Sequence, residues 1–289
     1  MLGKVVAVRF VITTIVLALI GLGLGFGFYN VALGGTPKVA VFDGALGVID
    51  DDLTAAIKVK LNFIADDPDI KAVVVRINSP GGSASASEEL YTSLAKLRES
   101  KPVVVSVQGI AASGSYMMSL GANEIYSNGT MIVGSIGAIL SPPGPSIPSE
   151  FVLATGPFKL SGGSERTYTE LLEEMKEAFW FAVSTERGDR LVAPRSEVLS
   201  GKIWLGLDAF RMGLIDAIGD ESDAIDAAVR LAGLNRYEIL NVEEAMEAAG
   251  GSAADAVAVA QSYEPVGDFD FDTTDSQFPY IHYLYLPPQ

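Results

Sequence analysis

Residues 101–116 read KPVVVSVQGIAASGSY, a β-branched run followed by small residues. The run from Val103 to Val107 predicts a buried strand, and the residues after Gly109 predict a short helix through Leu120. Ser113 is therefore expected near a helix N-terminus, where unpaired backbone N–H groups stabilise a developing negative charge. The alternative is that Ser113 only caps the helix or lets it pack closely.

A second strand-to-helix junction precedes this one in the chain. Asp69–Ile77 has the pattern of a buried strand and runs into Asn78-Ser79-Pro80-Gly81-Gly82, and an amphipathic helix begins near Ser83. Two glycines at a turn let a ligand approach the backbone closely. Two such junctions, one of them with a serine, are expected to form an oxyanion hole together.

The composition excludes several classes of site. The chain has 289 residues, 49% hydrophobic, which is enough for one substantial core with accessory segments. A net charge of −16 argues against nucleic-acid binding, and the lack of cysteine excludes disulfides, a thiolate nucleophile and cysteine-ligated metal. Asp268, Asp270 and Asp272 have the spacing of calcium ligands, but Thr273 replaces the required glycine. An acidic linker is predicted there, and no metal or cofactor is expected.

The N-terminus has the pattern of a membrane anchor. Phe10 to Tyr29 is almost wholly apolar and has the length of a membrane-spanning helix. Lys4 and Arg9 precede it, so the positive-inside rule keeps that end cytoplasmic. The alternative is a cleaved signal peptide with Ala32 near the cleavage site. The expected organisation is an anchor over 1–35, a catalytic domain over 36–250, and an acidic linker with a tyrosine-rich tail over 251–289.

Strand and helix patterns alternate through the catalytic domain, which predicts an α/β fold with parallel pairing. Lys38–Phe42 is the expected first strand, and Asp51–Asp66 the first helix. Thr167 and Glu170 have the spacing of a capping box that opens a long helix. Further strands are expected at 125–126, 132–139, 151–154 and 237–242, helices at 207–212 and 223–231, and a proline-rich loop at 141–149.

Three motifs together resemble one known family, the signal peptide peptidase A group of membrane-anchored Ser-Lys proteases. They are Ile77–Gly82, Gly109–Tyr116 and Gly134–Gly137, with weaker support from Ser200–Trp204 and from the turn Gly213-Leu214-Ile215-Asp216. The similarity extends over about residues 38–233. The resemblance implies a ClpP/crotonase-like fold of repeated ββα units, preceded by one transmembrane helix, and a homo-oligomer.

The resemblance also implies the site residues. The nucleophile of the family corresponds to Ser113, and its lysine base to Lys159 in Gly156-Pro157-Phe158-Lys159. The oxyanion donors correspond to the backbone N–H groups of Gly82 and Gly114. Two features depart from the family. A proline-rich loop replaces the usual helix before the lysine, and the proline that usually follows the lysine is missing.

The choice of base can also be made by elimination. His282, the only histidine, lies in the tyrosine-rich tail, so a lysine is the expected base for Ser113. Three lysines follow Ser113. Lys176 lies among glutamates and Lys202 follows a glycine in a predicted loop, whereas Lys159 has two apolar neighbours that favour a neutral amine. The alternative for Lys159 is a surface lysine at a strand end.

The expected function is a serine endopeptidase, single-pass in the cell membrane, whose Ser-Lys dyad works on the extracytoplasmic side. Remnant signal peptides or short apolar peptides are the expected substrates. The apolar tail from Phe278 to Leu286 is expected to dock on a neighbouring subunit, with an added strand as one mode of docking. The alternatives are a crotonase-type acyl-CoA enzyme and a catalytically inactive family member that acts as a membrane scaffold.

Overall fold

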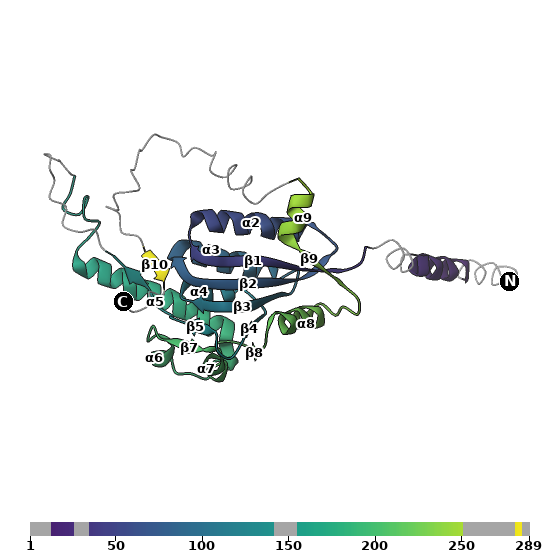
Figure 1. Cartoon of the computed structure of the whole chain (residues 1–289). Coiled ribbons are helices and arrows are strands. Elements are labelled where there is room, and N and C mark those ends of the chain that lie inside the picture. The colour runs from purple at the N-terminus through teal and green to yellow at the C-terminus, as the bar shows by residue number, and fades with distance from the viewer. Residues whose placement is uncertain (1–12, 26–34, 142–154, 251–280, 285–289) are drawn as a thin grey trace, which may run out of the picture.

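The structure is a computed structural model that describes residues 13–25, 35–141, 155–250 and 281–284 (Figure 1). A helix covers residues 13–25. The later strands are β1 (Lys38–Ile49), β2 (Ile70–Ser83), β3 (Val103–Ala112), β4 (Glu124–Ser127), β5 (Ile132–Gly134), β6 (Ile139–Leu140), β7 (Ile203–Leu205), β8 (Ala217–Ile218), β9 (Glu238–Asn241) and β10 (Ile281–Leu284). The helices are α2 (Asp51–Asp66), α3 (Ala84–Leu97), α4 (Gly114–Ser119), α5 (Glu165–Arg187), the 3-10 turn η1 (Gly188–Arg190), α6 (Arg195–Val198), α7 (Gly206–Arg211), α8 (Glu221–Leu231) and α9 (Val242–Ala248).

The strands of the described residues form one sheet with β2 at its centre. β1 pairs with β2 along one edge and β3 along the other, and β4 and β8 continue outward from β3. All of these pairs are parallel, and α2, α3 and α4 connect β1 to β4 in turn. The predicted α/β fold with parallel pairing is therefore confirmed.

The two faces of the sheet are buried by different helices, because side chains alternate along each strand. On one face Phe42, Val75 and Val105 pack with buried residues of α2 and α3. On the other face Val74 and Val104 pack with buried residues of α8. Figure 1 shows α2 and α8 on opposite sides of the strands. The β-branched run in the sequence is therefore a strand covered on both faces.

The N-terminal helix is described only in part. The predicted span from Phe10 to Tyr29 extends past both ends of the described helix at 13–25. Among the residues that the structure describes, no helix is long and apolar enough to cross a membrane.

The predicted glycine turn after Ile77 is wrong, because β2 continues through it to Ser83. A bulge interrupts the pairing with β3 between Ile77 and Ser79, and β1 pairs with β2 as far as Gly82. Because glycine has no side chain, these glycines allow β1 to approach β2 closely. A Cβ atom on Gly82 would lie 2.0 Å from the carbonyl oxygen of Ile49 in β1.

Two other expectations differ from the structure. Helix α5 begins at Glu165 with Ser164 as its N-cap, and the capping box joins Ser164 to Thr167, so the predicted cap at Thr167 is wrong. The predicted strand over 132–139 is divided into β5 and β6, because the backbone has positive φ at Gly134 (118°), where β5 ends, and at Ser135 (53°), which follows it. The predicted strand at 151–154 lies outside the described residues.

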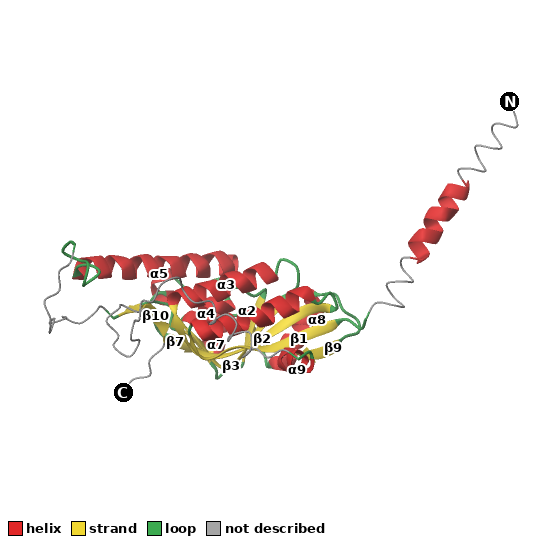
Figure 2. Ribbon diagram, turned by 90° about the horizontal axis from the view of Figure 1, so that it is seen from above, coloured by secondary structure: helices red, strands yellow, loops and turns green. Residues whose placement is uncertain are grey.

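Strand β10 comes from the C-terminal tail. It pairs antiparallel with β2 at Gly81–Ser83 and with β6 at Ile139 and Leu140. The tail was expected to add a strand to a neighbouring subunit, but these four residues add it to the sheet of their own chain. Figures 1 and 2 show β10 at the same end of the sheet as α4 and α5.

Candidate active site

Ser113 lies between the last residue of β3 and the first residue of α4. Its backbone has φ 55° and ψ −120°, a region that residues other than glycine rarely adopt. Its N–H donates to the Gly134 carbonyl (2.7 Å), and its own carbonyl accepts from the Met117 N–H (3.0 Å). The residue is 1% exposed, and its side chain makes no helix-capping hydrogen bond. Helix capping therefore does not explain this serine.

The ends of β2 and β3 are held together beside Ser113. The Ser115 hydroxyl lies within hydrogen-bond distance of the carbonyl oxygens of Ser79 (2.6 Å) and Ala112 (2.8 Å), one on each strand. The Ser79 hydroxyl in turn accepts from the Gly81 N–H at 3.1 Å. Both serine side chains are buried. Sequence patterns gave no reason to single out Ser115, because its role depends on a strand more than thirty residues away.

The two glycines predicted to donate to an oxyanion lie at these neighbouring strand ends. Gly82 lies near the end of β2, and Gly114 is the first residue of α4. Both are buried. The first N–H groups of a helix have no partner within it, so the N–H of Gly114 suits a donor role. Gly81 is less suited, because its N–H already donates to Ser79.

Lys159 lies in a different environment from Ser113. It occupies a turn before α5 in which its N–H donates to the Gly156 carbonyl at 3.4 Å, and its side chain is exposed. Phe158 (52% exposed) and Leu160 (58% exposed) do not cover it, so the expected apolar surroundings of the amine are wrong for the described residues. No hydrogen bond or ion pair described in the structure joins Lys159 to Ser113.

The loop that follows Lys159 is nevertheless close to the strands at this end of the sheet. Ser161 and Gly163 line a cavity of about 360 Å³ together with Leu140 of β6 and Tyr168 of α5. Strand β6 pairs with β10, and β10 pairs with β2 at Gly82. The loop is therefore linked to the Ser113 end of the sheet through two strands.

The other candidate bases are placed as follows. Lys176 is ion-paired with Glu173 on α5, in agreement with the solvated lysine that was expected. Lys202 is exposed, but its carbonyl accepts from the Ser135 N–H at 2.7 Å. Its backbone is thus close to Gly134, which bonds Ser113. His282 lies in β10, paired with Ser83.

A buried ion pair between Arg187 and Asp216 holds the turn that contacts α4. Arg187, 3% exposed, donates to both carboxylate oxygens of Asp216 (2.8 and 2.9 Å) and to the Gly213 carbonyl (2.7 Å). In the same turn the Leu214 carbonyl accepts from the buried Tyr116 hydroxyl of α4 at 2.8 Å. Desolvation, the largest single influence, opposes the charge on Arg187, but the hydrogen bond with Asp216 and the electrostatic attraction of Tyr116, Asp216 and Glu186 together raise the pKa of the guanidinium. Burial raises the pKa of Tyr116, which keeps it a neutral donor.

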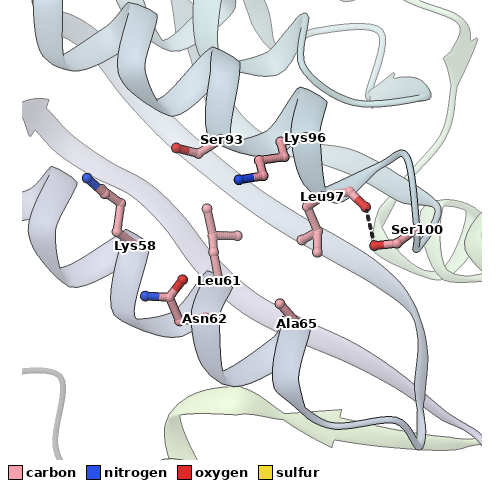
Figure 3. A pocket seen from close by; sticks show the side chains of 8 residues that line it. All are labelled: Lys58, Leu61, Asn62, Ala65, Ser93, Lys96, Leu97 and Ser100. Atoms are coloured by element: carbon pink, nitrogen blue, oxygen red, sulfur yellow. Dashed lines mark hydrogen bonds between the residues drawn. The ribbon is translucent and has the colours of Figure 1, made fainter.

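A second cavity lies away from these residues. Figure 3 shows it between α2 and α3, with Lys58, Asn62, Ser93 and Lys96 around Leu61 and Leu97. Its volume is about 370 Å³, and none of the predicted site residues lines it. It is therefore a surface groove between two helices, separate from the candidate active site.

Comparison with known sequences points to one protein family. Residues 95–144 and 159–235 match the sequence pattern of peptidase family S49. The chain is 35% identical over 193 residues to a putative protease of Synechocystis sp., covering 60% of this chain and 68% of that protein. The segment that contains Ser113 and the segment that begins at Lys159 both lie within the matched residues.

Longer relatives match over part of their length. Protease 4 of Salmonella typhi is 32% identical over 226 residues, which are 71% of this chain and 36% of that protein. The chloroplastic serine protease SPPA of Arabidopsis thaliana is 34% identical over 197 residues, which are 61% of this chain and 28% of that protein. The chain therefore spans only about a third of the length of these two relatives. Among solved structures, a mutant of the membrane-bound stomatin-specific protease 1510-N has 15% identity and a TM-score of 0.46, over 72% of this chain and 94% of that one.

Proposed function

Since this chain belongs to peptidase family S49, we propose that it is a serine endopeptidase in which Ser113 is the nucleophile and Lys159 the general base. The observation that carries the proposal is the strained backbone conformation of Ser113. A serine held at φ 55° between a strand and a helix stores strain, and such strain concentrates at functional sites. The same residue is buried and directly follows β3, which pairs with β2 as far as Ser79.

The reaction would proceed by acyl transfer. The Ser113 hydroxyl attacks a peptide carbonyl and passes its proton to the neutral amine of Lys159. The N–H groups of Gly82 and Gly114 donate hydrogen bonds to the carbonyl oxygen as it becomes negatively charged in the tetrahedral intermediate. The lysine then returns the proton to the departing amine, and water releases the acyl group from Ser113. This mechanism requires the turn that carries Lys159 to bring its amine within reach of the hydroxyl, about 3 Å.

The setting of the enzyme is part of the proposal. Phe10–Tyr29 would anchor the chain in the cell membrane as a single span, with residues 36–250 as a ClpP/crotonase-like protease domain outside the cytoplasm. Extended apolar peptides near the membrane, such as remnant signal peptides, would be the substrates, and the working form would be a homo-oligomer. If the anchor is uncleaved, the full-length protein should remain with membranes after a carbonate wash. An N-terminus that begins after Ala32 would instead identify a cleaved signal.

Labelling with a fluorophosphonate tests the nucleophile. The wild-type protein and the Ser196→Ala control, which changes an exposed serine, should be labelled and should hydrolyse a fluorogenic apolar peptide. The Ser113→Ala variant should do neither while keeping the same thermal unfolding midpoint to within a few degrees. A folded wild-type protein that is neither labelled nor active would favour the inactive scaffold, which the exposed Lys159 also favours.

A further inference from the structure

The two candidate oxyanion donors follow different strands, and these strands stop pairing before they reach the donors. Gly82 lies near the end of β2, whereas Gly114 follows β3 at the start of α4. The last pairing between β2 and β3 joins Ser79 to Ala111, before either glycine is reached. An oxyanion hole depends on donors that are already in place when the charge develops. A contact other than this strand pairing must therefore hold the two donors relative to each other.

The side chain of Ser115 connects the two strands where they separate. Its hydroxyl lies 2.6 Å from the carbonyl oxygen of Ser79, where the pairing of β2 with β3 ends. It also lies 2.8 Å from the carbonyl oxygen of Ala112, the last residue of β3. A hydroxyl has one proton, which Ser115 can donate to either oxygen. Since Ser115 is fully buried, water does not compete for this proton.

A second buried serine continues this connection towards Gly82. Ser79, whose carbonyl accepts from Ser115, uses its own hydroxyl oxygen to accept the N–H of Gly81 at 3.1 Å. Both serines are 0% exposed, and hydrogen bonds are stronger in such a low-dielectric interior than in water. Gly81 immediately precedes Gly82. Two buried hydrogen bonds therefore connect the start of α4 with the segment of β2 that carries the other donor.

Ser119, one turn further along α4, has a buried hydroxyl without this connection. It is also 0% exposed, and its hydroxyl donates to the carbonyl of Ser115 within the same helix, at 2.7 Å. Such a bond to the preceding turn satisfies a serine hydroxyl by local means. The carbonyl of Ala112 alone would satisfy Ser115 in a similar way. The additional contact with β2 is what distinguishes Ser115.

We propose that Ser115 is a positioning residue for the hydrolysis proposed above. Together with Ser79, it holds the N–H of Gly82 at the distance from the start of α4 that the oxyanion requires. This inference rests on the proposed function, because it assigns further residues to the same site. Both hydroxyls are buried and bonded to the backbone, so they act through Gly82 and not on the substrate. Their contribution therefore belongs to the transition state, when charge develops on the carbonyl oxygen, and not to substrate binding.

Three alanine variants of the full-length chain test the proposal. Ser115→Ala removes the contact between the strands, and Ser79→Ala removes the acceptor of the Gly81 N–H. Ser119→Ala is the matched control, because it removes an equally buried hydroxyl and its hydrogen bond from the same helix. Hydrolysis of the fluorogenic apolar peptide gives KM and kcat. The value of kcat is expressed per Ser113 labelled by the fluorophosphonate, so that a misfolded fraction does not lower it.

Inhibition by a peptide aldehyde gives a readout that a purely structural role would not change. The hydroxyl of Ser113 adds across the aldehyde carbonyl to form a hemiacetal, whose former carbonyl oxygen takes the oxyanion position. Ser115→Ala and Ser79→Ala should lower kcat and weaken this inhibition by the same factor, about 10- to 100-fold, with KM unchanged. The double variant should lose no more than the larger single loss, because the two bonds form one network. Ser119→Ala should match the wild type.

The outcomes separate this inference from the proposed function. Wild-type kcat and aldehyde inhibition in Ser115→Ala, in a protein whose hydrolysis depends on Ser113, would overturn the inference and leave the protease standing. Equal losses in Ser115→Ala and Ser119→Ala would show that only the packing of α4 matters, which also contradicts the inference. A higher KM with unchanged kcat would move the role to substrate binding and reject the positioning of the oxyanion donor. A folded wild-type protein that is neither labelled nor active would reject the protease and the positioning role together.

Discussion

The substitution Gly82→Ala tests whether the close contact between β1 and β2 positions the candidate oxyanion donor. An added Cβ would lie 2.0 Å from the Ile49 carbonyl oxygen and 2.5 Å from its nitrogen, whereas ordinary contact begins at 3.4 Å. The strands must therefore separate by at least 1.4 Å at this point. The obstacle is steric only, since the φ of Gly82 is outside the left-handed region. Overpacking of this kind costs about 1–3 kcal/mol of unfolding free energy.

The effect on catalysis should be larger than the effect on stability. A displacement of about 1 Å at a reacting group can lower kcat on the order of 100-fold, so Gly82→Ala should be nearly inactive while still folding. The control is Gly129→Ala, where the added Cβ makes an ordinary 4.0 Å contact with Leu207 and both properties should be unchanged. Thermal unfolding and peptide hydrolysis are measured on each variant. A Gly82→Ala protein with wild-type kcat would refute the assignment of this N–H to the oxyanion hole.

Three further predictions concern the base, the buried ion pair and the strained serine. Lys159→Ala should lower kcat/KM by at least about 100-fold and Lys202→Ala should keep most activity; the reverse result would place the base at Lys202. Arg187→Ala should lower the unfolding free energy by about 3 kcal/mol, at the low end for a broken buried pair, because the Asp216 carboxylate keeps only the half-exposed Arg190 as an ion-pair partner. Arg211→Ala breaks an exposed pair and should cost at most about 0.5 kcal/mol, so equal denaturation midpoints of the two variants would contradict this prediction. The free energy of unfolding of Ser113→Gly should be about 1 kcal/mol higher than that of Ser113→Ala, because only glycine adopts the positive φ without strain. Equal free energies of unfolding would mean that the strain is absent.

The sequence predicted the parts of the fold whose signals are local. The strand at Val103–Val107, the helix at Asp51–Asp66 and the short helix after Ser113 are all present, because a β-branched run or an amphipathic period identifies each of them. The junction after Ile77 was misjudged for the opposite reason. Proline and two glycines favour a turn locally, but β1 on one edge and β10 on the other hold this segment as a strand.

The candidate site also has features that local sequence predicts and features that depend on distant segments. The positions of Ser113 and Gly114 at a strand-to-helix junction followed from residue patterns alone. The link from Ser115 to Ser79 and the pairing of the tail with Gly82 join segments far apart in sequence, which no local pattern encodes. Whether the side chains of Ser113 and Lys159 meet depends on the conformation of the turn that carries Lys159. The apolar residues that flank Lys159 are exposed in this turn, so they did not predict whether its amine is buried.

The strongest indication that Ser113 is more than a structural residue comes from other serines at the same position of a helix. Ser83 caps α3 and Ser164 caps α5, each with negative φ and with its side chain accepting an N–H of the first turn. Ser113 precedes α4 in the same way, yet it has positive φ and no such bond. A serine needed only for capping would adopt the geometry of the other two, because that geometry satisfies a backbone donor without strain. The strain of about 1–3 kcal/mol at Ser113 is offset by its two backbone hydrogen bonds, each with a net contribution of about 0.5–1.5 kcal/mol. The fold therefore stabilises a conformation that leaves the hydroxyl uncommitted to the helix, as a nucleophile requires.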